Sequence, residues 1–118
     1  MTQALIKIFQ GIWALLRLQT VTITNTYTVD SGTYPDCVVL CNFSAAKAVT
    51  LPAHSLGRVL AFKDIAGNAS TNNITLTPAS GNIDGFSTYV LNLNKAGVLL
   101  VDDGTNYWVI AAYNGTVI

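Results

Sequence analysis

The stretch from Val49 to Ile110 constrains the fold most, because short apolar runs alternate there with polar turn sequences. The runs have the length and composition of strands, and the segments between them carry Gly, Pro, Asn or Asp, which favour turns. No helical period separates the runs. The pattern predicts a mostly β domain, arranged as a compact β-sandwich, a jelly-roll or a small barrel rather than a parallel α/β sheet.

The region before this stretch predicts one long strand. Threonine occupies every second position from Thr20 to Thr28, and mostly apolar residues lie between, so we expect a half-buried strand over Gln19 to Val29. Further strands are expected at Cys37 to Phe43, Ala48 to Leu51, Arg58 to Asp64, Ile74 to Thr77, Tyr89 to Leu93, Val98 to Val101 and Tyr107 to Ala112.

Residues 3 to 18 carry the strong helical period of the chain. Polar or small residues form one narrow stripe, and large apolar residues fill the rest of the circumference. Such a helix must be covered. A secretory signal is disfavoured because Lys7 and Arg17 interrupt the apolar run, which is also shorter than a membrane span. Two positive charges offer little attraction to anionic lipid. We therefore expect the helix to dock onto protein, by packing with other copies or in a groove of a host assembly.

Composition excludes some partners. The chain has 118 residues, enough for one domain with its own core. Six basic and six acidic residues cancel, Glu is absent, and only 10% of residues are charged while 51% are hydrophobic. There is no basic patch for nucleic acid. So few charges suggest instead that a partner covers much of the surface.

Five residues are candidates for catalysis, His54 and four aspartates. His54 is the single histidine, and we expect an exposed loop residue because no nucleophile motif accompanies it. Asp64, Asp84, Asp102 and Asp103 could pair as acid and base, but each stands in a turn sequence where its carboxylate can accept backbone N–H groups. We expect no catalytic residue.

The two cysteines predict no cofactor or metal site. Cys37 and Cys41 share a face of one strand but lie too far apart for a disulfide, and together with His54 they supply too few metal ligands. We interpret them as buried, reduced thiols.

Tyr107 and Trp108 should point to opposite faces of their strand, one into the core and the other towards a neighbouring subunit or ligand.

The turn and strand phrases resemble a β-module of bacteriophage virion proteins, which include tail fibres, spikes and small capsid-attached proteins. The matching positions are Thr50 to Pro52, Gly57 and Arg58, Lys63 and Asp64, Gly67 to Ala69, Asn72 to Pro78, Ile83 to Gly85, and Asp103 to Ile110. The resemblance covers roughly the last two-thirds of the chain. Tyr107 departs from a frequent tryptophan, and the first forty-eight residues have no counterpart.

We expect the 118 residues to be a complete small protein, which favours a capsid decoration, or cement, protein over a fibre. The expected organisation is a helical arm at residues 1–19 and a β-domain at residues 20–118. The resemblance implies a virion structural protein, and together with the short chain and the lack of a catalytic motif it leads us to expect a non-enzymatic homotrimer on the capsid surface, made in the host cytoplasm and bound to the major capsid protein. The expected partner-binding residues of the arm are Leu5, Phe9, Ile12, Trp13 and Leu16. The alternative is a tail-fibre or receptor-binding component that recognises a host glycan, and a tail-associated hydrolase ranks third.

Overall fold

The computed structural model describes residues 3–4, 18–32 and 35–113. Strands dominate this part of the chain. They are β1 (Thr20–Ile23), β2 (Tyr27–Thr28), β3 (Val38–Cys41), β4 (Lys47–Leu51), β5 (Val59–Asp64), β6 (Ile74–Pro78), β7 (Tyr89–Leu91), β8 (Gly97–Asp102) and β9 (Tyr107–Tyr113). The sequence-based strands from Cys37 onwards are confirmed to within two residues at either end.

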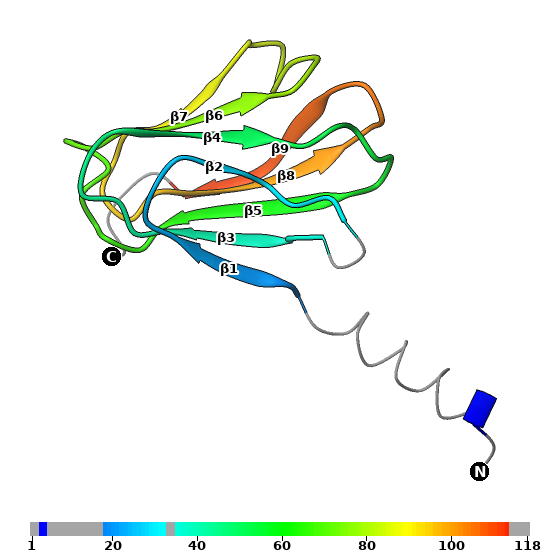
Figure 1. Cartoon of the computed structure of the whole chain (residues 1–118). Coiled ribbons are helices and arrows are strands. Elements are labelled where there is room, and N and C mark those ends of the chain that lie inside the picture. Colours follow the sequence, from blue (N-terminus) through cyan, green and yellow to red (C-terminus); the bar gives the residue numbers. More distant parts are fainter. Residues whose placement is uncertain (1–2, 5–17, 33–34, 114–118) are drawn as a thin grey trace.

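Two sheets form the fold, and the first six strands alternate between them (Figure 1). One sheet has the order β1-β3-β5-β8-β9 and the other β2-β4-β6-β7. Within each sheet the alternating strands pair in parallel. Thr20 is opposite Val38, and Val38 is opposite Ala61. Each pair of consecutive strands, one in each sheet, therefore lies directly beside the preceding pair.

The last three strands pair differently. β7 is antiparallel to β6, β8 is antiparallel to β5, and β9 is antiparallel to β8. The register of β8 and β9 shifts between Leu99 and Leu100, because Leu99 is opposite Ala111 whereas Leu100 is opposite Val109. This β-bulge leaves Ile110 without an opposite residue.

The core lies between the two sheets. Alternate residues of each strand point inwards, as the two-residue period requires. The five-stranded sheet contributes Val39, Cys41, Leu60, Phe62 and Leu100, and the four-stranded sheet contributes Val49, Leu51, Ile74, Leu76 and Leu91; all belong to one cluster of buried side chains.

Two expectations about the fold need correction. The protein is mostly β, as predicted, but a jelly-roll is built from antiparallel strands and the first six strands here pair in parallel. The chain returns through the opposite sheet between successive parallel strands, so no crossover helices are needed. The long strand over Gln19 to Val29 is also wrong. Asn25 accepts a hydrogen bond from the backbone N–H of Thr26 (2.8 Å) at a turn that carries the chain from one sheet to the other.

The predicted helical arm lies almost wholly outside the described residues. This applies to all five residues expected to bind a partner, Leu5, Phe9, Ile12, Trp13 and Leu16.

Candidate functional site

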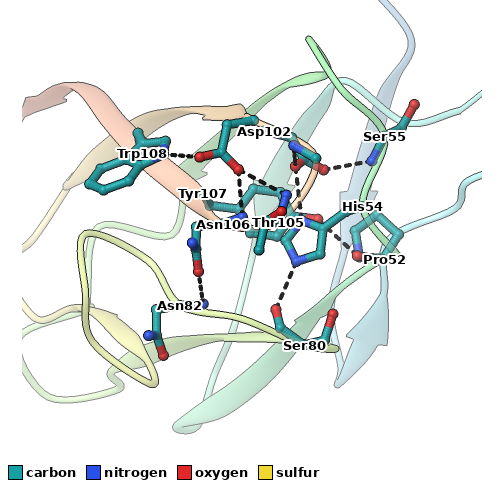
Figure 2. Close-up of polar contacts among 12 residues, drawn as sticks. Pro52, His54, Ser55, Ser80, Asn82, Asp102, Thr105, Asn106, Tyr107 and Trp108 are labelled. Atoms are coloured by element: carbon teal, nitrogen blue, oxygen red, sulfur yellow. Dashed lines mark hydrogen bonds and ion pairs between the residues drawn. The ribbon is translucent and has the colours of Figure 1, made fainter.

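A cluster around His54 brings together residues from distant parts of the chain (Figure 2). His54 lies in the loop between β4 and β5, Asp102 ends β8, and Tyr107 begins β9. The turn that follows β6 supplies the carbonyl of Ser80. The cluster therefore joins three loops at one end of the two-layer structure.

Asp102 is buried and its carboxylate accepts three hydrogen bonds. The donors are Nδ1 of His54 and the backbone N–H groups of Ser55 and Gly104, each at 2.8 Å. Two of these donors belong to the β4–β5 loop and one to the β8–β9 turn. A single carboxylate thus fixes both loops while its own charge is compensated by donors.

His54 is held at both ring nitrogens. Nδ1 lies against the Asp102 carboxylate and Nε2 lies 2.9 Å from the backbone oxygen of Ser80. Both partners are acceptors, so the arrangement is satisfied when both nitrogens carry protons. Desolvation lowers the pKa of His54, but the hydrogen bonds to Ser80 and Asp102 and the charges of Asp102 and Asp103 outweigh it and raise the pKa above its usual value.

Tyr107 packs beneath the imidazole and completes the cluster. The two rings are tilted by 37° with centroids 4.8 Å apart. The buried phenol donates to the carbonyl of Pro52 (2.8 Å). Burial, followed by the charge of Asp102, raises the pKa of Tyr107 to about 12, so the hydroxyl remains a donor at neutral pH.

This geometry suits a structural clamp better than a catalytic base. A histidine acting as a base needs a free lone pair directed at a substrate or nucleophile, whereas Nε2 of His54 donates to a backbone carbonyl. Close packing supports the clamp. Gly81 has a φ of 66°, and a Cβ there would collide with the backbone oxygen of Thr105.

The prediction for His54 was wrong in one respect. We expected an exposed loop histidine, but only 9% of the side chain is accessible. Its partner Asp102 lies far away in sequence, and no local spacing links the two residues.

The other three aspartates also accept hydrogen bonds from main-chain N–H groups, and for Asp64 and Asp103 most of these donors lie in the same turn, as predicted; the donor to Asp84 lies on a distant strand instead. Asp64 is buried and accepts from Gly67, Ala69 and Lys95, all at 3.0 Å. Asp84 accepts from Val109 (2.8 Å). These carboxylates hold turns in place across the sheet ends.

Asp103 also binds a tryptophan side chain. Its carboxylate accepts from Nε1 of Trp108 (2.7 Å) and from the backbone N–H groups of Thr105 and Asn106. The hydrogen bond from Trp108 and those from the backbone lower the pKa of Asp103. Tyr107 is buried and Trp108 is exposed, which confirms that the two aromatic residues face opposite sides.

The cysteines are free, as predicted. Cys41 is buried, and desolvation together with the charge of Asp64 raises its pKa to about 12. Cys37 is only partly buried, so the expectation of burial holds for one of the two thiols.

Among the described residues no group of three or more His, Cys, Asp or Glu side chains is placed to hold a metal ion. In the same part of the chain no helix is long and apolar enough to cross a membrane.

A second candidate is the outer face of the five-stranded sheet, which faces away from the core. Because Leu60, Phe62 and Leu100 point inwards, their neighbours Val59, Ala61, Leu99 and Val101 point outwards. In register, Val59 is opposite Val101, which is opposite Trp108. The next outward row consists of Thr20, Val38, Ala61, Leu99 and Ala111.

This outer face carries little charge. Lys63 is the one ionised side chain among its described strand residues, and its ammonium lies 4.6 Å from the centroid of the Tyr113 ring at the edge of the sheet. Val59 and Trp108 are both more than 40% exposed, and Ile110 at the bulge is 62% exposed. A continuous apolar surface of this kind is typical of a contact with another protein surface.

Comparison with known proteins adds no family. No family model matches the chain, and no curated protein matches it.

Proposed function

We propose that this protein is a capsid decoration protein, a non-enzymatic β-domain that binds the assembled shell of a phage as a homotrimer. The observation that carries the proposal is the outer face of the five-stranded sheet, an apolar surface spanning β3, β5, β8 and β9. The polar candidates give independent support, because His54 and the four aspartates are already engaged in holding loops. The phage-like turn phrases supply the virion context.

The proposed partners are the major capsid protein and other copies of the same chain. A protein that binds only the assembled shell stabilises it by mass action, and the gain grows with occupancy. Three-fold positions on a shell favour a closed trimer. The arm residues Leu5, Phe9, Ile12, Trp13 and Leu16 are the proposed anchor.

Co-sedimentation with capsids tests the anchor. Trp13→Asp combined with Leu16→Asp places two charges in a desolvated contact, at a cost of several kcal/mol, so binding should be lost while the β-type circular dichroism remains. Gln10→Asp combined with Ala14→Asp is the matched control, because it adds the same two residues on the polar stripe. Full occupancy by the first variant would contradict the anchor.

Light scattering tests the trimer. The purified protein should have about three times the mass of the 12.6 kDa chain. A monomer in solution that is also monomeric on the particle would refute this part of the proposal.

Trp108 favours the second candidate, a fibre or receptor-binding component. Its indole is 44% exposed and fixed by Asp103, an arrangement that also suits stacking on a sugar ring. Saturable binding to host surface glycan that is abolished by Trp108→Ala, without binding to capsids, would favour this function over decoration.

A further inference from the structure

We propose that in the free protein the apolar segment 5–17 folds back onto the outer face of the five-stranded sheet of its own chain. The inference goes beyond the proposed function, because it concerns the protein before it meets a shell. Segment 5–17 and the outer face of the five-stranded sheet are both apolar, and only Leu18 and Gln19 separate the segment from the first strand of that sheet.

The position of the attachment point is the first argument. Leu18 precedes Thr20 by two residues, so it lies on the same, outward face as Thr20. It is 66% exposed. In register it extends towards the row that contains Val59, Val101 and Trp108. The row of the apolar face that contains Val59 and Trp108 thus begins where segment 5–17 joins β1.

Dimensions provide the second argument. Five strands span about 19 Å from β1 to β9, given a spacing of about 4.8 Å. A helix of thirteen residues is about 20 Å long at 1.5 Å per residue. Segment 5–17 can therefore reach from the edge strand β1 to β9 without a gap.

Chemistry provides the third argument. In a helix, Leu5, Phe9, Ile12 and Leu16 lie on one side, and Lys7, Gln10 and Ala14 lie on the other. Docking the apolar side therefore leaves the polar stripe in water. A shallow hollow of about 280 Å³, lined by Leu99, Ala111 and Tyr113 among others, can receive a large side chain from the segment.

This contact gives the anchor two alternative sites. The apolar side of the helix cannot lie on its own sheet and on a shell at the same time. Folding back would keep the free protein from exposing both surfaces, and the shell would have to compete with the sheet for the segment.

The fluorescence of Trp108 tests the contact in the full chain. In a Trp13→Phe background Trp108 is the sole tryptophan. The inference predicts blue-shifted emission and weak acrylamide quenching, and both should be reversed by Phe9→Asp combined with Leu16→Asp. Gln10→Asp combined with Ala14→Asp should leave the signal unchanged. Equal quenching in parent and Phe9→Asp/Leu16→Asp protein would overturn the inference, as would protection that disappears on dilution, which would assign the cover to a second copy.

Limited trypsin digestion tests the same contact from the sheet side. Lys7 and Arg17 are the cleavage sites around the segment. Ala61→Asp places a charge in the centre of the outer face and should speed cleavage at both sites about tenfold or more, since cleavage tracks the undocked population. A matched change on the other sheet, Val90→Asp, should not. Unchanged cleavage in Ala61→Asp, with the β-domain still folded, would overturn the inference. Neither experiment contains a shell, so failure here is distinguishable from failure of the proposed function.

Discussion

Removing the carboxylate of Asp64 should be among the most destabilising changes available outside the apolar core. Asp64 ends β5 with its side chain buried, and its two oxygens accept from Gly67, Ala69 and Lys95. Asp64→Ala leaves all three N–H groups without this partner. Water can reach those of Gly67 and Lys95, but Ala69 is fully buried and its N–H stays unsatisfied.

The expected loss follows from these contacts. Hydrogen bonds to a charged group contribute about 1.5–3 kcal/mol each, while rehydration of two donors and relief of the buried charge offset part of the total. We expect Asp64→Ala to lower the free energy of unfolding by about 3 kcal/mol. For a domain of this size, about 4 °C of melting temperature corresponds to each kcal/mol, so the shift should be about 12 °C.

Two further variants make the measurement specific. Asp64→Asn can keep the two bonds at one oxygen position but turns an NH₂ group towards Gly67, so it should lose only about 1–2 kcal/mol. Asp84→Asn is the control, because Asp84 has a φ of 49°, which asparagine tolerates, and the amide oxygen can still accept from Val109. Urea unfolding followed by circular dichroism gives all three values. A loss below about 1 kcal/mol for Asp64→Ala would refute this account of the turn.

Two more predictions concern the His54 cluster. Because the pKa of His54 is raised on folding, its stabilisation is present below the unfolded pKa and is lost as the pH rises through the folded pKa; the melting temperature of the parent should therefore fall relative to His54→Gln as the pH rises above the usual pKa of histidine, about 6.5. Parallel curves for the two proteins would contradict this. Gly81→Ala should cost several kcal/mol, because a Cβ collides with Thr105, whereas Gly57→Ala, also at positive φ but with open space, should cost about 1 kcal/mol of backbone strain. Equal losses in thermal unfolding would show that Gly81 is needed only for its backbone angle.

Strand positions could be predicted from sequence because each depends on a local pattern. The period of two and the Gly, Asn and Asp turns place β3 to β9 without knowledge of their partners. The same period failed between Thr20 and Thr28. Alternation continues unbroken across the turn at Asn25, so it cannot reveal that β1 and β2 belong to different sheets.

Pairing and the His54 cluster could not be predicted, because both depend on contacts between distant segments. A hydrophobic pattern gives the inward face of a strand but not the direction of its neighbour. In the same way, the sequence around His54 contains no sign of Asp102 or of the Ser80 carbonyl. The local roles of Asp64 and Asp103 were accessible because most of their donors follow within a few residues.

The two edges of the paired sheets are not equivalent, and strands can be added in parallel at only one of them. At one end the parallel edges of β1 and β2 present backbone groups on which a further pair of strands could be added in the same register (Figure 1). At the other end β7 and β9 run antiparallel to their neighbours and break the parallel sequence. Lengthening such a protein by duplication would therefore be simplest ahead of β1, while the clamp around His54 stayed untouched.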